Sequence, residues 1–209
     1  MLTIRYVYAR AVAENPLGCN IYVAVSNTAS ASSELYSISN TGALTLIGSL
    51  QNPNGTPFYV DEMECDNSGN LIFLNGINVS SVPQASIAGS TITVQSNGTI
   101  GTTTLNRRYS LCRNGLQMRV VMDNKPFSGP TTATVYNLTV PMSGSASVSA
   151  VASYNSPVNS TVDIATYYHA GVLYYAKNGS LYNLVSGANA GTTTMSTFND
   201  MTFRGTCGQ

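Results

Sequence analysis

The sequence predicts an all-β protein, built as a four-bladed, propeller-like array of repeats. Short runs of β-branched and aromatic residues recur, such as IYVAV at 21–25, and Gly, Asn, Ser or Pro bounds each run. Five Asn-Gly pairs supply the positive φ angles that tight hairpin turns require. Similar runs also recur about every fifty residues. No window combines helical periodicity with capping signals, so we expect no helices.

The repeats are defined by four similar strands, which start at residues 21, 71, 118 and 172. Each is followed by a second strand, expected at 34–39, 91–95, 134–140 and 180–185. A strand of small residues comes next, at 43–48, 99–104, 146–151 and 191–197. Each unit then leads into a strand for its successor, at 58–66, 106–113, 162–169 and 198–204. Four strands per unit are typical of propeller blades, and a β-sandwich or jelly roll is the alternative.

The two ends of the chain need separate treatment. Residues 1–20 are expected to form an N-terminal strand or arm, and residues 21–209 a single domain of four repeats. The strand at Thr3–Arg10 has three interpretations: an extra outer strand, the leading strand of the first blade, or an arm that pairs with a neighbouring subunit. The last strand, Phe198–Arg204, is expected to close the ring by pairing with Ile21–Val25.

Ring closure would place two of the four cysteines, Cys19 and Cys207, beside the same turn. A disulfide between them would stabilise the fold by roughly 2–4 kcal/mol. Against this pairing, a protein made without a signal peptide normally keeps its thiols reduced. The cysteines form no CxxC pair, so their spacing does not predict a zinc site.

Charge is scarce and balanced, with 9 Lys and Arg against 9 Asp and Glu. Charged residues make up 9% of the chain, compared with roughly 25% in an ordinary soluble domain. A net charge of zero argues against nucleic-acid binding, which needs a cationic surface. A hydrophobic content of 43% argues against disorder. We find no signal peptide and no apolar stretch long enough to span a membrane.

Two segments resemble a known group of propellers. LYSISNTGALTLIG at 35–48 and DNSGNLIFLNG at 66–76 are similar to blade segments of NHL-repeat and gluconolactonase-type β-propellers. The resemblance implies a propeller fold and, as one expectation, a lactonase-like hydrolase. The chain departs from these families in having four units instead of six. Their metal-binding carboxylates have no residue-by-residue match here, so no catalytic site is carried over.

Charged residues concentrate in the strands that lead each unit, which hold 10 of the 18 in the chain. If these strands are innermost, their side chains would form a polar or ligand-binding site on the central axis. The alternative is that carboxylates and arginines simply pair and hold the blades in register. The candidate axial residues are Asp61, Glu64, Arg108, Arg113, Asp163, His169, Asp200 and Arg204. Carboxylates of this set are potential Ca²⁺ ligands, but no DxDxDG loop is present, so we predict neither metal nor cofactor.

Catalytic motifs are absent from the sequence. The single histidine, His169, would have to serve any Ser/His/Asp triad, and it lies in a strand-like run beside two tyrosines. No GxSxG, P-loop, HExxH or GxGxxG pattern occurs. We therefore do not expect an enzyme.

Two other classes of function fit the sequence better. A charge-poor, Ser/Thr/Asn/Gly-rich β chain is typical of a structural or assembly protein of a virus particle or phage tail, located in the virion or an extracellular appendage. Such a protein associates with itself or with other structural proteins. The alternative is a module that binds glycans or a host surface, for which tyrosines would stack on sugars; the candidates are Tyr36, Tyr154, Tyr174 and Tyr182.

Overall fold

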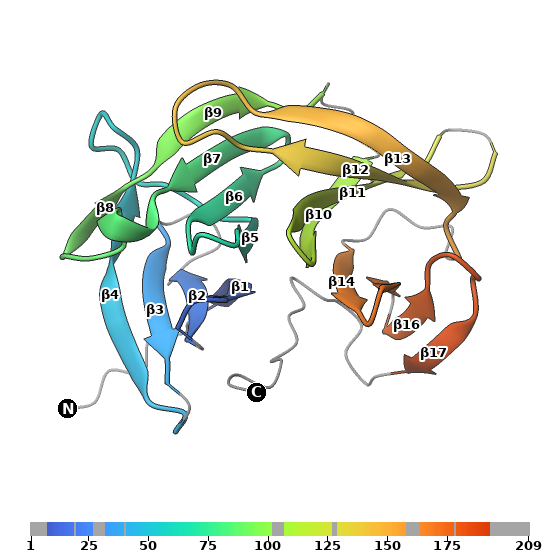
Figure 1. Ribbon diagram of the computed structural model, residues 1–209, viewed down its shortest axis with the longest axis horizontal. Coiled ribbons are helices and arrows are strands. Elements are labelled where there is room, and N and C mark those ends of the chain that lie inside the picture. The colour runs from blue at the N-terminus through green and yellow to red at the C-terminus, as the bar shows by residue number, and fades with distance from the viewer. Residues whose placement is uncertain are drawn as a thin grey trace.

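In the computed structural model, the described residues are 8–18, 20–26, 32–39, 41–101, 107–126, 129–157, 164–177 and 179–192. They form seventeen β-strands and one 3₁₀ turn, at Gln84–Ser86 (Figure 1). The strands are β1 (Tyr8–Glu14), β2 (Ile21–Ser26), β3 (Glu34–Ile38), β4 (Leu44–Gln51), β5 (Glu62–Cys65), β6 (Leu71–Asn75), β7 (Asn78–Val82), β8 (Thr91–Thr93), β9 (Gln95–Thr99), β10 (Arg107–Asn114), β11 (Gln117–Asn124), β12 (Thr132–Thr139), β13 (Ser147–Asn155), β14 (Ala165–His169), β15 (Val172–Lys177), β16 (Ser180–Asn183) and β17 (Asn189–Thr192). The predicted all-β class is confirmed.

The strands form four sheets, which we call blades 1 to 4. Their strand orders are β1-β2-β3-β4-β8, β5-β6-β7-β9, β10-β11-β12-β13 and β14-β15-β16-β17. Figure 1 shows the sheets arranged around a central region, with β1, β5, β10 and β14 nearest the centre. These leading strands are neighbours in space, β1 beside β5, β5 beside β10 and β10 beside β14. The fold is a four-bladed β-propeller, as predicted.

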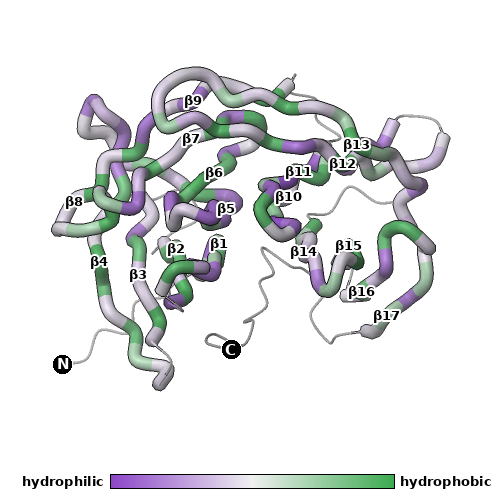
Figure 2. The backbone as a smooth tube through the Cα atoms, viewed as in Figure 1, coloured by the Kyte–Doolittle hydropathy of each residue, from purple (hydrophilic) through white to green (hydrophobic). Residues whose placement is uncertain are grey.

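The hydrophobic core lies in the seams between consecutive blades. Blades 1 and 2 meet at a cluster that includes Phe58 and Phe73, whose rings pack edge to face with centroids 5.6 Å apart. Ile72 belongs to the cluster between blades 2 and 3, so adjacent residues of β6 serve opposite seams. A strand that is covered on both faces has apolar residues at successive positions, which explains the sequence LIFLN of β6. Figure 2 shows hydrophobic residues recurring along the strands of each blade.

The repeat is also visible in the irregularities of the sheets. In each blade the fourth strand carries one extra residue where it pairs with the third strand. In blades 1, 3 and 4 this bulge lies beside Tyr36, Tyr136 and Tyr182, the central residues of similar third strands. A bulge increases the local twist of a strand, and its repetition supports the four-unit interpretation.

The N-terminal strand is the leading strand of the first blade, one of the three interpretations left open by the sequence. β1 pairs with β2 from Tyr8 to Glu14, four residues beyond the predicted end at Arg10. β3 occupies the opposite edge of β2. The expected pairing of residues 198–204 with β2 is therefore wrong, because both edges of β2 are already bonded. Residues 198–204 themselves lie outside the described part.

The second unit also differs from the prediction. Its third strand is β7, which was not predicted because NVSSV is polar, although Ser81 and Val82 are wholly buried. Residues 91–95 do not supply that strand. Instead, β8 leaves blade 2 and pairs in parallel with β4 of blade 1. The outer strand of blade 2 is β9, which ends at Thr99, where the prediction had placed the start of a strand.

Candidate functional site

Hydrogen bonds between buried polar groups join three leading strands at the centre of the propeller. Glu62 Oε2 of β5 accepts hydrogen bonds from the Ser110 hydroxyl and the Leu111 backbone N–H of β10, both at 3.2 Å. The Ser110 hydroxyl oxygen in turn accepts bonds from the backbone N–H and hydroxyl of Thr166 in β14, both at 3.0 Å. Each of these three side chains is buried. These hydrogen bonds fix the positions of β5, β10 and β14 relative to one another along the central axis.

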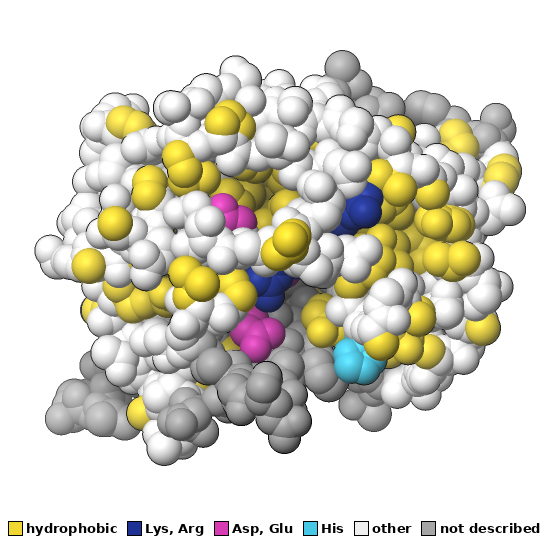
Figure 3. Space-filling view, viewed as in Figure 1, with side chains coloured by type: hydrophobic (Ala, Val, Ile, Leu, Met, Phe, Trp, Pro, Cys, Tyr) yellow, Lys and Arg dark blue, Asp and Glu magenta, His cyan; other side chains and the backbone are white. Residues whose placement is uncertain are grey.

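A second cluster of polar side chains lies nearer the ends of the leading strands, and each blade contributes one side chain to it. We call Glu14, Glu64, Arg113 and Tyr167 the axial cluster; they come from β1, β5, β10 and β14 in turn. Electrostatic interactions couple Glu64 to Glu14 and Arg113, and couple Tyr167 to the other three. Acidic and basic side chains adjoin near the centre of the face shown in Figure 3.

The environment of Glu64 decides the charge of the cluster. Burial raises the pKa of Glu64 to about 7, while the nearby Arg113 guanidinium and a 2.8 Å hydrogen bond from the Cys65 backbone N–H oppose this shift. The negative charge of Glu14 raises the pKa further. Glu64 therefore exchanges its proton near neutral pH, and the cluster changes charge there.

Tyr167 borders the cluster on the blade 4 side. Burial raises its pKa, and the carboxylates of Glu14 and Glu64 act in the same direction, against Arg113. The phenol therefore keeps its proton and can donate a hydrogen bond. Its ring stacks on that of His169, with centroids 6.4 Å apart and an interplanar angle of 25°.

The predicted axial residues divide between the two ends of the leading strands. Glu64 and Arg113 lie together, and the exposed His169 is at the same end of β14. Asp61 precedes β5 at the opposite end, where it is exposed and accepts a 3.0 Å hydrogen bond from the Gly76 backbone N–H. Arg108 is also near that end, about 17 Å along β10 from Arg113 at roughly 3.4 Å per residue. The single cluster expected from the sequence is thus not formed by these residues together.

Five predicted residues lie outside the described part of the chain: Asp163, Asp200, Arg204, Cys19 and Cys207. The Cys19–Cys207 disulfide accordingly stays a prediction. Cys65 and Cys112 are free thiols and buried.

Two members of the axial cluster were not predicted from the sequence. Glu14 lies in the segment that was set apart as an arm, yet the sequence holds a signal for it. Glu14 and Glu64 each stand seven residues before the first residue of the following strand, Ile21 and Leu71. Tyr167 carried no signal of its own, since tyrosine is common in strands.

The cluster contains two carboxyl groups, one guanidinium and one phenol. Of these, Arg113 also lines a pocket of about 270 Å³, together with Asp66, Gln117 and other residues. Such groups bind polar molecules through hydrogen bonds. Within the described residues, no group of three or more His, Cys, Asp and Glu side chains is arranged to hold a metal ion.

Comparisons with known proteins give no family for this chain. No protein-family model matches it, and a search of curated proteins finds no match. Over the described residues, no helix has the length and hydrophobicity needed to cross a membrane.

Proposed function

We propose that the protein is a non-enzymatic structural subunit, of the kind that builds a virus particle or phage tail, and that it associates with copies of itself or with other structural proteins. The observation that carries this proposal is the absence of charge from the described strands at its periphery. We call the outermost strands β4, β8, β9, β13 and β17 the rim. No Asp, Glu, Lys or Arg occurs in any of these five strands.

An uncharged rim suits a surface that becomes covered. Burying a charged side chain costs several kcal/mol unless it is well paired, and the cores of protein interfaces are depleted of charge. In Figure 3 the basic and acidic side chains of the described residues gather toward the centre of the view, and the outer parts show neither. On this face, the charges of the described residues are therefore concentrated toward the centre of the propeller.

The rim also exposes apolar side chains. Leu44 and Leu46 of β4 are 58% and 52% exposed, and Val151 of β13 is 50% exposed. Apolar groups on a strand edge favour contact with another polypeptide.

Strand β13 is the part of the rim best suited to contact. Propellers usually leave only short, protected edges, and β9 and β17 have five and four residues. The last residues of β4 are covered by β8. β13 has nine residues without Pro or charge, and no described strand pairs with its outer edge. Its one protective feature is the bulge at Val151.

The alternatives have less support. The four tyrosines named as sugar-binding candidates are half-buried, and Tyr154 and Tyr182 pack against the core between blades 3 and 4. The Tyr36 hydroxyl donates a hydrogen bond to Glu34 Oε2, at 2.9 Å. A lactonase-like hydrolase would rest on the resemblance to NHL-repeat and gluconolactonase-type blades alone.

The proposal is tested by light scattering of the purified chain across a concentration series. We expect a mass that is a multiple of 22.0 kDa. Val151→Lys should shift the mass toward that of one chain, because it places a charge at the centre of the β13 edge. Leu116→Lys is the matched control, since Leu116 is 88% exposed at the β10–β11 turn and away from the rim. A wild-type chain that stays monomeric at every concentration would contradict the proposal.

A further inference from the structure

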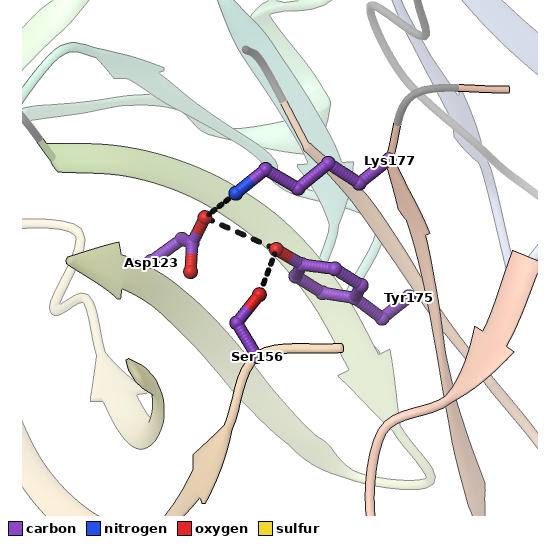
Figure 4. Close-up of polar contacts among 4 residues, drawn as sticks. All are labelled: Asp123, Ser156, Tyr175 and Lys177. Atoms are coloured by element: carbon purple, nitrogen blue, oxygen red, sulfur yellow. Dashed lines mark hydrogen bonds and ion pairs between the residues drawn. The ribbon is translucent and has the colours of Figure 1, made fainter. Parts of the chain in front are cut away.

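A lysine and an aspartate face each other in the seam between blades 3 and 4. Lys177 ends β15 and Asp123 lies in β11, 54 residues apart in the sequence. Their side chains are 0% and 3% exposed, and Lys177 Nζ donates a hydrogen bond to Asp123 Oδ2. Figure 4 shows Tyr175 and Ser156 completing the group, with the Tyr175 hydroxyl 3.0 Å from both Asp123 Oδ2 and the Ser156 hydroxyl.

The hydrogen bonds of this group leave a charged pair incompletely satisfied. An ammonium group has three N–H donors, but within the described residues Lys177 Nζ has Asp123 Oδ2 as its one acceptor. Asp123 Oδ2 accepts from Lys177 and Tyr175, whereas the buried Oδ1 has no hydrogen-bond partner among the described residues. Charges removed from water without full compensation tend to neutralise by proton transfer.

The pKa of Asp123 is shifted in the direction that favours the neutral acid. Burial raises the pKa of the carboxyl above its ordinary value, although Lys177, Tyr175 and Ser156 act to lower it. Transfer of one proton from Lys177 to Asp123 leaves a neutral amine, which is a nucleophile, against a neutral carboxylic acid, which is an electrophile.

We propose that Lys177 and Asp123 condense to an isopeptide bond that joins blade 3 to blade 4. The Lys177 Nζ lone pair attacks Asp123 Cγ and forms the C–N bond. The bond from Cγ to one carboxyl oxygen then breaks, and that oxygen leaves as water after it takes up a proton from the nitrogen. One water molecule is released, no group is oxidised or reduced, and no co-reactant is needed.

The seam supplies what this reaction requires. Holding two reacting groups in contact removes the entropy cost of bringing them together, and well-oriented intramolecular reactions reach effective molarities of about 10⁵–10⁸ M. Burial excludes the water that would solvate the amine and the acid. The Tyr175 hydroxyl donates a hydrogen bond to the carboxyl oxygen and is placed to stabilise the negative charge that develops there during the attack.

The inference does not depend on the proposed assembly function, because the bond lies within one chain. It assigns Lys177 and Asp123 a covalent role in place of a buried ion pair. The linked chain would contain a closed loop that persists when the protein is denatured.

Intact mass spectrometry of the denatured chain tests the proposal directly. We expect wild-type protein to be lighter than its sequence mass by one water molecule, and digestion to release a branched peptide containing Asp123 and Lys177. Lys177→Met should have its full sequence mass. Tyr175→Phe should lower the linked fraction without abolishing it.

Two results would overturn the proposal. A wild-type chain at its full sequence mass would show that the pair does not condense. Loss of water that persists in Lys177→Met would assign the dehydration to another site. Both readings come from the denatured chain, so they hold even where a variant fails to fold.

Discussion

Glu64 is a carboxyl group held at the axis of the propeller, 7% exposed, with a pKa raised from 4.5 to about 7. Between these two pH values the folded chain binds more protons than the unfolded chain. The free energy of unfolding therefore falls as the pH rises from 4.5 to about 7. At about 1.4 kcal/mol per pKa unit, Glu64 alone accounts for a loss of about 3 kcal/mol.

Glu64→Gln removes this titration, so we expect a pH profile of stability that is flatter by about 3 kcal/mol across the same window. Urea unfolding at intervals between pH 4.5 and about 7 measures the profile. Glu34→Gln, at a carboxylate in β3 far from the axis, is the control for loss of a carboxyl group elsewhere. If Glu64→Gln keeps the wild-type slope, Glu64 is not the group that titrates.

At the scale of single residues, the sequence located part of the axial cluster. Glu64 and Arg113 were found because charge is scarce in this chain and the leading strands concentrate it. The hydrogen bonds from Ser110 and Thr166 were beyond prediction, since Ser and Thr make up 48 residues and nothing distinguishes these two. Asp61 and Glu64 are close in sequence, yet three residues of extended chain span roughly 10 Å and separate them along the axis.

At the scale of strands, the contact between β4 and β8 depends on Gly48. A Cβ atom at this position would lie 2.2 Å from the Gly89 backbone oxygen, and backbone cannot swing aside as a side-chain end can. The Ser49 backbone N–H next to it donates to the Ser90 carbonyl at 3.1 Å. Gly48 is therefore required for β8 to cover the edge of β4.

We expect Gly48→Ala to destabilise the protein by about 1–3 kcal/mol, the usual cost of forcing extra volume into a packed site. Gly191→Ala is the matched control. Gly191 pairs with Leu181 beside the bulge of blade 4 as Gly48 pairs with Leu35 beside that of blade 1, but a Cβ atom at Gly191 would meet nothing within 4 Å. Its substitution should change stability by less than about 0.5 kcal/mol. Equal losses in the two variants, measured by urea unfolding, would show that the close approach to Gly89 is not the cause.

Most strands were predictable because their apolar and aromatic residues alternate with turn signals, as in β3, β12 and β16. β7 was not, because its serines are polar by type and buried by position. β8 was recognised as a strand but assigned to the wrong blade. A parallel partner distant in sequence leaves no local signal, since only tertiary packing selects it.

At the scale of the whole molecule, charged side chains are kept apart from the rim. Several charged side chains lie at the axis, as Glu64 and Arg113 do, or in a seam, as Asp123 and Lys177 do. The rim strands expose uncharged polar side chains and a few apolar side chains to water. Association through such a surface would be driven by apolar burial and hydrogen bonds instead of ion pairs.

This segregation predicts how the proposed assembly responds to salt. Electrostatic contacts weaken as the screening length falls to about 3 Å at 1 M salt, whereas apolar contacts do not. We therefore expect the mass measured by light scattering to stay constant, or to rise, as sodium chloride is increased to about 1 M. The Val151→Lys variant should recover part of its association at high salt, because screening weakens the repulsion between the introduced charges. A wild-type assembly that dissociates steadily with added salt would place its contacts on charged residues, and therefore away from the rim.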